Sequence, residues 1–389
     1  MGKSSLFKAM TLVDVAIAEY PFTTIEANKG IGYVRVEDPG YEFGVASNPR
    51  YGFLKGKYRF VPIEIIDVPG LVPGAHEGRG LGNKFLDNLR QADALILVID
   101  ASGSTNEEGE FIGYGNYDPS KDIDFLIREL DMWIYSILER NWNKSVRLDV
   151  QKIKPKETIL HEILSGLKIS EKDIKCSLIE LGLEDKSMQN WSNDDKKRFA
   201  SMVREVSKKI AIAANKADLP SAKENIEMLK KKYKEMLIVP TSAVAEIALR
   251  KADKNGIIEY IPGEGHFKII DDSKLNEKQK EGLKYIEEKV LKVYGNTGVQ
   301  NILDKVVFDV LKYIAVFPAG VNKLADKEGR VLPDCFLLPT GSTALDFARA
   351  IHEDFAKNFI KVIDARTKRA HGKDYILKHR DVLEVIFGR

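Results

Sequence analysis

The chain has 389 residues, of which 44% are hydrophobic and 30% charged, a composition typical of a soluble protein with two or three domains. Its formal net charge is only +2, so the overall charge gives no reason to expect nucleic-acid binding, and any basic surface has to be local. We see no secretory leader pattern and no apolar run of roughly 20 residues, and the two widely spaced cysteines, Cys176 and Cys335, suit free thiols, so we expect a cytoplasmic protein that contacts no membrane.

Strand and helix patterns alternate in the first third of the chain. Residues 4–11 can open a helix, and residues 58–70 have the pattern of a strand that ends in a turn. Residues 81–93 have the spacing of an amphipathic helix. Residues 94–102 form a short, almost wholly apolar run, as a parallel strand covered on both faces requires. This alternation predicts an α/β domain.

A long segment without strand patterns follows, from about residue 121 to residue 208. Residues 122–142 carry apolar side chains at the helical period over about five turns, and residues 160–169 and 195–206 also have helical patterns. The apolar positions of the first of these helices are Ile123, Leu126, Ile127, Leu130, Ile134, Ile137 and Leu138. We therefore predict a helical, coiled-coil-like insertion in the α/β domain.

The α/β pattern resumes after this insertion. Residues 209–218 and 236–243 are apolar strands separated by a helix at 222–234, and helical patterns return at 277–293 and 299–313. The last 73 residues or so hold short strands broken by Pro and Gly around one helix, which indicates a small α+β module. The expected parts are the interrupted α/β domain at 1–120 and 209–315, the insertion at 121–208 and the C-terminal module at 316–389.

The chain opens with Gly2-Lys3-Ser4-Ser5, which matches the end of a phosphate-binding loop. At the N-terminus of a helix, free N–H groups and the helix dipole attract phosphate. Lys3 would then reach the β- and γ-phosphates, and Ser4 would ligate Mg²⁺. The full pattern needs an earlier glycine and a preceding strand, so this tetrapeptide alone is weak support.

The strand near residue 66 ends in a second candidate motif, Asp-Val-Pro-Gly. Asp67 at the carboxyl end of a strand can hold Mg²⁺ through water, and Gly70 can offer its N–H to a γ-phosphate. The alternative is a plain turn between a strand and a loop, which the spacing alone favours.

A third motif, Asn-Lys-x-Asp, ends the strand near residue 214 and consists of Asn215, Lys216 and Asp218. The Asp218 carboxylate can accept two hydrogen bonds from guanine, whereas adenine has no such pair of donors. Asn215 and Lys216 would brace the loop and cover the base. Ser242 and Ala243 follow the next strand, where their N–H groups can reach a purine carbonyl. Taken alone, each is also an ordinary polar or small-residue turn.

The order of these motifs decides between the alternatives. Gly-Lys-Ser comes first, then Thr23-Thr24, Asp-x-x-Gly, Asn-Lys-x-Asp and Ser-Ala, and the last three each follow a predicted strand. In open α/β sheets, ligands bind beyond the carboxyl ends of the strands, and the chances of independent coincidences multiply to a small number. We therefore predict a P-loop GTPase fold with a doubly wound sheet.

Residues 20–34 and 67–102 resemble the Obg-related translation-factor GTPases, in particular the YchF-like branch. The helical insertion also matches that branch. Residues 338–386 resemble a TGS domain, a small β-grasp-like α+β module of ribosome- and RNA-associated proteins. The resemblance covers nearly the whole chain. It implies a Mg²⁺-dependent GTPase whose nucleotide state controls contact with the ribosome or RNA.

The same resemblance implies roles that the residues' own patterns do not assign. Thr23 and Thr24 would lie in the first switch, with Thr24 ligating Mg²⁺, and residues 70–82 would form the second switch. Leu71 stands where Ras-like enzymes place the glutamine that orients water. We therefore expect slow hydrolysis, helped by a backbone group, by a monovalent cation such as K⁺, or by a partner. The predicted catalytic residues are Lys3, Thr24 and Gly70.

The chain departs from the family pattern in two places. Many YchF-like proteins deviate from Asn-Lys-x-Asp and prefer ATP, but this chain keeps Asp218, so we expect GTP. Family members also have a strand and Gly-x-Pro-Asn-x ahead of Gly-Lys-Ser, and losing that central strand would leave its two neighbours unpaired. We expect that translation begins several codons upstream and that Met1 stands where the family often has Val.

Residues 357–380 contain the one clear charge imbalance, with eight Lys and Arg residues against two Asp residues. They can form a patch that follows RNA phosphates or an ordinary solvated face, and the TGS resemblance favours ribosome or RNA contact. No aromatic platform for base stacking is evident, so we expect recognition of shape and backbone. The candidate RNA-binding residues are Lys361, Arg366, Lys368, Arg369 and Lys373.

Three functions stay open on the sequence alone. The first is a slow GTPase that switches its contact with ribosome or RNA, and the second is an ATPase of the same fold. The third is a nucleotide-dead RNA-binding protein, if the chain truly starts at Met1. In each case we expect a monomer.

Overall fold

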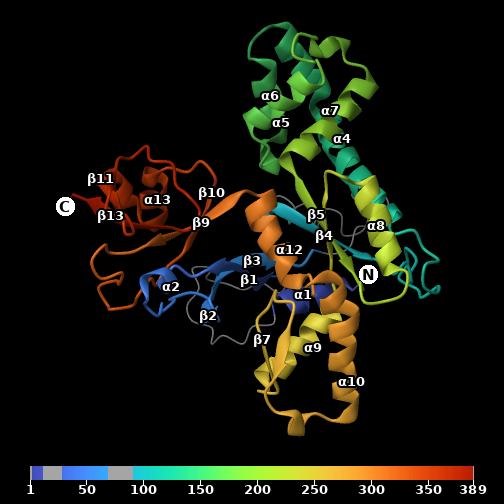
Figure 1. The fold of residues 1–389 in the computed structure, drawn as a ribbon. Coiled ribbons are helices and arrows are strands. Elements are labelled where there is room, and N and C mark those ends of the chain that lie inside the picture. The colour runs from blue at the N-terminus through green and yellow to red at the C-terminus, as the bar shows by residue number, and fades with distance from the viewer. Residues whose placement is uncertain (1, 12–28, 69–90, 389) are drawn as a thin grey trace. The chain divides into compact units, whose positions relative to one another are not determined.

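The computed structural model describes residues 2–11, 29–68 and 91–388, and these residues form two compact units (Figure 1). Unit 1 comprises Met1–Gly2 and Ile66–Pro240, and unit 2 comprises Lys3–Ile65 and Thr241–Arg389. Each unit is described by itself. The predictions for Thr23, Thr24, Gly70, Leu71 and the segment 70–82, and residues 81–90 of the expected helix at 81–93, lie outside the described residues.

Unit 1 contains a parallel sheet of three strands in the order β4-β5-β6. These strands are β4 (Ala94–Asp100), β5 (Lys209–Asn215) and β6 (Leu237–Pro240). From its second residue onward β5 is buried, as expected for a central strand covered on both faces. The register places Asp100 opposite Asn215, so the carboxyl ends of β4 and β5 lie side by side.

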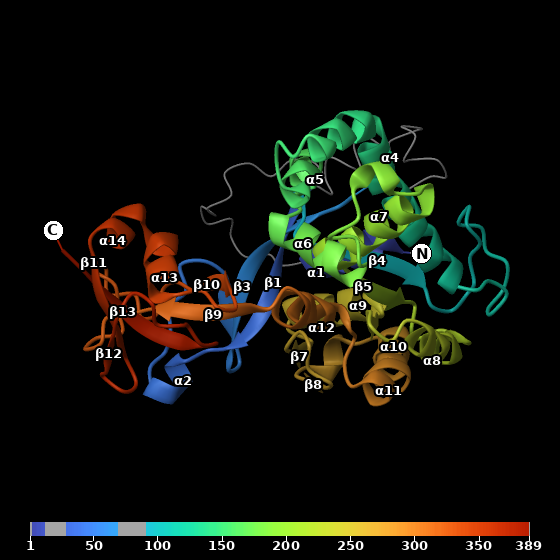
Figure 2. The ribbon, with the colours of Figure 1, turned by 90° about the horizontal axis from the view of Figure 1, so that it is seen from above.

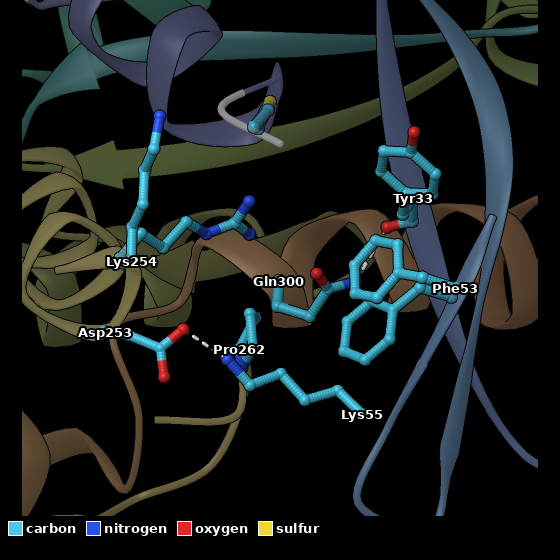
Figure 3. Close-up of a pocket in the computed structure, with 10 residues that line it drawn as sticks. Tyr33, Phe53, Lys55, Asp253, Lys254, Pro262 and Gln300 are labelled. Atoms are coloured by element: carbon cyan, nitrogen blue, oxygen red, sulfur yellow. Dashed lines mark hydrogen bonds and ion pairs between the residues drawn. The ribbon is translucent and has the colours of Figure 1, made fainter. Parts of the chain in front are cut away.

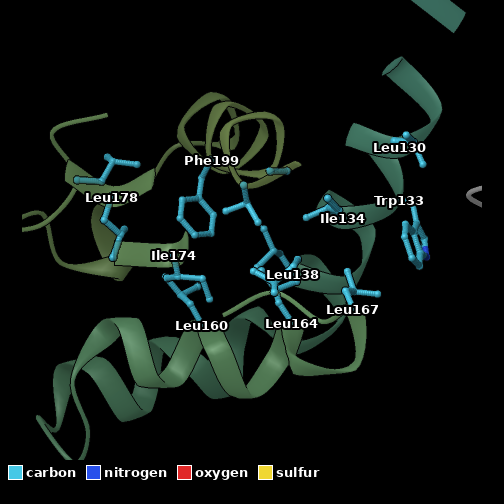
Figure 4. Close-up of a cluster of buried hydrophobic side chains, with 14 of the residues drawn as sticks. Leu130, Trp133, Ile134, Leu138, Leu160, Leu164, Leu167, Ile174, Leu178 and Phe199 are labelled. Carbon is cyan, nitrogen blue, oxygen red and sulfur yellow. The ribbon is translucent and has the colours of Figure 1, made fainter. Parts of the chain in front are cut away.

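The predicted helical insertion is confirmed between β4 and β5 of unit 1. Leu138, Leu160, Ile174 and Phe199 come from different helices and meet in one hydrophobic core (Figure 4). The third helix of the insertion, which the sequence patterns did not predict, begins with a capping box between Ser170 and Asp173. The helices are α4 (Ser120–Val150), α5 (Lys156–Leu164), α6 (Glu171–Glu180) and α7 (Asn193–Ser207), and α8 (Ala222–Lys232) follows β5.

Unit 2 contains the remaining α/β elements. A second sheet has the strand order β1-β3-β2. Its strands are β1 (Lys29–Glu37), β2 (Phe53–Lys55) and β3 (Tyr58–Ile66), whose last residue belongs to unit 1, and β7 (Ile258–Tyr260) pairs separately with β8 (Phe267–Ile269). The helices are α1 (Lys3–Thr11), α2 (Gly40–Phe43), α9 (Ala243–Lys254), α10 (Glu277–Ile286), α11 (Lys292–Tyr294) and α12 (Val299–Lys305), with π-helical turns at Glu287–Leu291 and Val306–Val310.

The predicted α/β class with a parallel sheet is confirmed. The sequence predicts one doubly wound sheet. The described strands of the α/β elements instead form two separate sheets, with the orders β1-β3-β2 and β4-β5-β6. Within residues 2–11, 29–68 and 91–388, no helix has both the length and the apolarity to span a bilayer.

The C-terminal module is a five-stranded sheet in the order β10-β9-β13-β11-β12 (Figure 2). β9 and β13 are parallel, and the other pairs are antiparallel. Helix α13 buries Ala344 and Phe347 in the core formed with the sheet. The elements are β9 (Tyr313–Pro318), β10 (Phe336–Pro339), α13 (Ala344–Ile351), α14 (Glu353–Lys357), β11 (Phe359–Asp364), β12 (Ala370–His371) and β13 (Asp381–Phe387).

Candidate nucleotide-binding site

Strand β4 ends at Asp100, whose buried carboxylate collects several hydrogen bonds. The Ser102 N–H and hydroxyl donate to Oδ1 at 3.1 and 2.6 Å, and the Ser104 and Thr105 hydroxyls donate to Oδ2, both at 2.8 Å. These donors all lie within five residues of the strand end, so the backbone curls around the carboxylate. Sequence reasoning did not single out Asp100, although an acid that ends an apolar strand before Ser-Gly-Ser-Thr is a usable signal.

Lys216 in the Asn-Lys-x-Asp loop reaches the same carboxylate, with its Nζ 2.8 Å from Asp100 Oδ2. Burial tends to raise the pKa of Asp100, but the bonds from Lys216 and from the serine and threonine hydroxyls hold that pKa well below its ordinary value. Lys216 has a φ of +60°, in the left-handed region. For a side chain with a Cβ this conformation costs about 1–2 kcal/mol, and the ion pair offsets it.

The two other residues of this loop lie beside Lys216. Asn215 ends β5 and is almost fully buried, and Asp218 is half-buried on a turn that the Leu219 N–H closes by donating to the Lys216 carbonyl at 3.1 Å. An ionised carboxylate is an acceptor only. The turn therefore presents an acceptor for paired donors beyond the carboxyl end of a parallel strand, where open α/β sheets bind ligands.

Gly2 lies against this loop inside unit 1. Its φ of +85° belongs to the left-handed region, and a Cβ at this position would stand only 2.6 Å from Asn215 Nδ2. Only glycine combines that backbone conformation with so close an approach. The structure therefore brings together the start of Gly-Lys-Ser and the first residue of Asn-Lys-x-Asp, as the order of the motifs predicted.

The rest of Gly-Lys-Ser continues into helix α1 of unit 2. Lys3, Ser4 and Ser5 form its first turn, with the two serines exposed, while Leu6 and Ala9 bury the opposite side. The division between the units runs between the second and third residues of the chain. The predicted helix opening is confirmed, and the roles of these residues toward phosphate stay predictions.

Ser242 and Ala243 are placed differently from the small-residue turn considered in the sequence analysis. Ser242 caps the N-terminus of α9, where its Oγ accepts from the Ala245 N–H at 3.3 Å, and Ala243 is the first residue of the helix. The Ser242 N–H donates to the Thr297 carbonyl at 2.9 Å. Ser242 is therefore a buried helix cap, and its contact with a purine stays a prediction.

One turn further along α9, Glu246 organises a buried polar network in unit 2. It accepts hydrogen bonds from Arg250 Nε at 2.6 Å, from the Tyr260 hydroxyl at 2.8 Å and from the Thr297 hydroxyl. Its side chain is fully buried, and that of Arg250 is 8% exposed. This network joins α9 to β7 and to the loop before α12.

Asp67 follows β3 and is half-buried in unit 1. Its carboxylate and the Ser4 hydroxyl are hard oxygen donors, the type that Mg²⁺ takes. No cluster of three or more His, Cys, Asp or Glu side chains suited to a metal occurs among the described residues. Mg²⁺ usually keeps several waters and takes one or two carboxylates besides phosphate oxygens, so the chemistry of the Asp67 carboxylate fits this cation.

Unit 2 also has a cavity of about 190 Å³ (Figure 3). Tyr33, Phe53 and Gln300 face it, and an ion pair between Lys55 and Asp253 lies at its edge. Pockets for organic ligands usually measure about 300–1,000 Å³. This cavity is smaller, and none of the predicted nucleotide-binding residues lines it.

The basic stretch of the C-terminal module is partly engaged in holding unit 2 together. Arg366 Nε lies 2.7 Å from Glu42 Oε2, and Lys368 Nζ donates to the Val321 carbonyl at 2.7 Å. Of the five predicted RNA-binding residues, Arg366 and Lys368 therefore have structural partners. The other three, Lys361, Arg369 and Lys373, are exposed.

Two aromatic side chains of this stretch contact each other, and the expected recognition of shape and backbone stays a prediction. The His371 and Tyr375 rings stack with their centroids 4.2 Å apart. Both residues are half-buried. The turn after β12 brings the two rings together although three residues lie between them in the chain, which the sequence pattern does not reveal.

Both cysteines are free thiols, as expected. Cys176 is exposed, while burial raises the pKa of Cys335 to about 12. A thiol with so high a pKa is neutral and unreactive at physiological pH.

Three family models match consecutive parts of the chain. The model of 50S ribosome-binding GTPases matches residues 1–129, that of the G4 motif-containing domain of YGR210-like Obg-like GTPases matches 213–320, and that of TGS domains matches 323–387. The match at 213–320 contains the Asn-Lys-x-Asp loop, and the match at 323–387 covers the five-stranded module except β9.

Individual proteins agree with these models. The chain is 49% identical to an uncharacterized GTP-binding protein of Methanocaldococcus jannaschii, over 99% of this chain and 96% of that protein. It is 27% identical to a ribosome-binding ATPase YchF of Buchnera aphidicola, over 100% and 96%. The crystal structure of a GTP-binding protein from Pyrococcus horikoshii matches with a TM-score of 0.77 and 39% identity, covering 100% of this chain and 97% of that one. The chain therefore belongs to the Obg-related, YchF-like family of P-loop GTPases with a C-terminal TGS domain.

Proposed function

We propose that this protein binds GTP together with Mg²⁺, hydrolyses it slowly, and uses its nucleotide state to control contact with the ribosome or RNA. The observation that carries the proposal is the meeting of Gly2 with Asn215 in unit 1, beside a base-recognition loop whose Lys216 is held by Asp100. Phosphate-binding and base-recognition motifs are thereby adjacent, as one nucleotide requires.

Guanine is the base that the loop favours. Asp218 is intact and half-buried at the end of β5, and its carboxylate suits the paired N1–H and amino donors of guanine. The relatives from Methanocaldococcus jannaschii and Pyrococcus horikoshii are named GTP-binding proteins, which supports the same choice.

Mg²⁺ would be held by the Ser4 hydroxyl, by Asp67 through water, and by Thr24. The cation would neutralise charge on the β- and γ-phosphates when bound. Lys3 would bind the same phosphates from the first turn of α1, and Gly70 would donate its N–H. Turnover would be slow because Leu71 stands where Ras-like enzymes have the glutamine that orients water. K⁺ or a partner would then assist hydrolysis.

Contact with the ribosome or RNA is proposed for the TGS module. Its exposed cations Lys361, Arg369 and Lys373 support this, because phosphate contacts supply most of the affinity in sequence-independent RNA binding. The Buchnera aphidicola relative is named a ribosome-binding ATPase, which points to the same class of partner.

ATP is the second candidate nucleotide, because that relative is named an ATPase. GTP and ATP differ in how far their affinity depends on the Asp218 carboxylate. Adenine offers no donor pair to its carboxylate, so ATP affinity would be indifferent to this side chain.

Calorimetry on the full chain and on Asp218→Ala tests the proposal. Two hydrogen bonds to a charged acceptor are worth about 3–6 kcal/mol together, so GTP affinity should fall by at least roughly 100-fold. Glu107→Ala, which removes an exposed carboxylate of the same unit, should bind GTP as the wild type does. Equal GTP affinity in wild type and Asp218→Ala, or no GTP binding by the wild type, contradicts the proposal.

A further inference from the structure

The Asp100 carboxylate joins two segments of unit 1 that are far apart in the sequence. Oδ2 accepts from the Ser104 and Thr105 hydroxyls just after β4, and it also pairs with Lys216 Nζ after β5, all at 2.8 Å. Asp100 is 1% exposed. The parallel register makes this possible, because it sets Asp100 directly opposite Asn215, next to Lys216.

We propose that Asp100 is a positioning residue for base recognition, which holds Lys216 and thereby fixes the turn that presents Asp218 to guanine. The inference deepens the proposed GTP site and rests on it. Asp100 does not touch the base in this scheme. It acts through Lys216, whose backbone begins the turn on which Asp218 lies.

The backbone of the turn needs such a partner. Lys216 has a φ of +60°, where most residues with a Cβ are strained, and the turn is closed by one hydrogen bond from the Leu219 N–H to the Lys216 carbonyl. A flexible lysine side chain does not by itself hold a strained conformation. The buried Asp100 carboxylate supplies the restraint, because Oδ2, the oxygen that pairs with Lys216, is also held by the Ser104 and Thr105 hydroxyls.

The same contacts define what Lys216 contributes to the nucleotide. Its ammonium lies 2.8 Å from Asp100 and 3.4 Å from the Ser104 hydroxyl, so its charge is directed into the protein. Lys216 therefore serves the site through the shape of its loop and the apolar stem of its side chain. A neutral residue with a similar stem would lose the restraint and keep the stem.

A double-mutant cycle tests whether Asp100 acts through Lys216. GTP affinity is measured by calorimetry for Asp100→Asn, for Lys216→Met and for the double variant. Each single variant should bind GTP about tenfold more weakly, and the double variant no more weakly than the worse single one, because both remove the same restraint. A loss of about 100-fold in the double variant, the product of two independent effects, overturns the proposal.

Ser102→Ala is the matched control. It removes one hydroxyl that donates to the same carboxylate and leaves the ion pair with Lys216 in place. GTP affinity should change less than about threefold, and thermal unfolding should show all variants folded. If Ser102→Ala weakens GTP binding as much as Asp100→Asn, general loosening explains the result and the positioning role is wrong.

Amide hydrogen exchange in the nucleotide-free full chain is the second measurement. In Asp100→Asn and in Lys216→Met, the Leu219 N–H should exchange about tenfold faster or more, because the turn opens. The Ala245 N–H, which the Ser242 hydroxyl caps in unit 2, should be unchanged. Lys216→Met also covers the case in which Asp100→Asn fails to fold, because the Lys216 side chain is 27% exposed.

The two measurements separate the inference from the proposed function. If the wild type binds no GTP but both variants expose the Leu219 amide, the proposed function fails and the positioning of the turn stands. If exchange at Leu219 is unchanged in both folded variants, the positioning role is wrong whatever the nucleotide affinity.

Discussion

Two buried carboxylates, one in each unit, organise two of the segments predicted to bind the base. Asp100 in unit 1 accepts from Ser102, Ser104, Thr105 and Lys216. Glu246 in unit 2 accepts from Arg250 on α9, from Tyr260 on β7 and from Thr297 in the loop before α12. Both satisfy several donors with one acid, which is the condition under which a buried charge is tolerated.

Their partners differ in kind. Lys216 is partly exposed and strained, and it lies in a loop, whereas Arg250 and Tyr260 are buried in a regular helix and strand. Burial, followed by the neighbouring Glu246 charge, raises the pKa of Tyr260 well above its ordinary value, so its hydroxyl stays a donor at physiological pH. The two carboxylates therefore differ in what they hold: Asp100 restrains a loop, the role proposed above for base recognition, whereas Glu246 joins packed elements of the fold.

The largest effect is expected for Glu246→Ala. It leaves the Arg250 guanidinium buried without its acid, which typically costs 3–5 kcal/mol, and urea unfolding should show a loss of about that size. Glu259→Ala, an exposed acid on β7, should change stability by less than about 0.5 kcal/mol. The ratio of GTP to ATP affinity should be unchanged in folded Glu246→Ala. If Glu246→Ala changed the ratio of GTP to ATP affinity and left stability unchanged, Glu246 would act on base recognition. Its proposed difference from Asp100 would then be wrong.

Asp304 extends the comparison to a carboxylate that its partners do not fully compensate. It accepts from the Arg35 N–H at 2.7 Å and from Gln300 Nε2 at 2.8 Å, but burial raises its pKa from 3.8 to about 6. Between these values the folded protein binds a proton that the unfolded chain has lost, so stability should fall as pH rises from about 4 to 6 and then level off.

The size of this pH effect is on the order of 2–3 kcal/mol. Denaturant unfolding of wild type and Asp304→Asn across that pH range isolates it, because all other titrating groups are shared. The difference in unfolding free energy should decline with rising pH and be flat above about pH 7. A flat difference throughout would mean that Arg35 and Gln300 compensate this acid as fully as Lys216 and the hydroxyls compensate Asp100.

Gly2→Ala should have a smaller effect, confined to the nucleotide. It adds a Cβ 2.6 Å from Asn215 Nδ2 at a φ of +85°, and we expect GTP affinity to fall about tenfold, equivalent to roughly 1–2 kcal/mol. Gly109→Ala is the matched control, since Gly109 has the same φ of +85° with open space around it. Equal GTP affinity in the two variants would show that the approach of Gly2 to Asn215 is irrelevant to binding.

The smallest effects are expected in the TGS module. Replacing Lys361, Arg369 and Lys373 by Ala should weaken binding to purified ribosomes and lower the slope of log affinity against log salt by about 2–3. Arg366→Ala removes the ion pair with Glu42, so it should lower stability slightly and leave that slope nearly unchanged. If Arg366→Ala has the larger effect on the slope, the division between structural and exposed cations is wrong.

Long, periodic segments were predictable from the sequence, and partners distant in the chain were not. The apolar runs gave β4 and β5, and the 3.6-residue period gave α4, because these signals are local. Helix α9 was not predicted, because Thr-Ser-Ala is also typical of a turn. The structure shows that Ser242 caps the N-terminus of this helix. The β1 strand was missed as well.

The candidate site shows the same limit. Asp218 was found because its motif is contiguous, whereas Asp100 was missed because its partner Lys216 comes from the neighbouring strand end. The partners of the basic stretch were not predictable for a related reason. Glu42, which engages Arg366, lies more than 300 residues away in the chain.

Calorimetric titration of the 389-residue chain with GTP and with ATP, each with Mg²⁺, tests the central claim most directly. Asp218 rewards the donor pair of guanine, so GTP should bind at least about 100-fold more tightly than ATP. Equal affinities, or a preference for ATP, would contradict the assignment of the Asn-Lys-x-Asp loop as a guanine-recognition site.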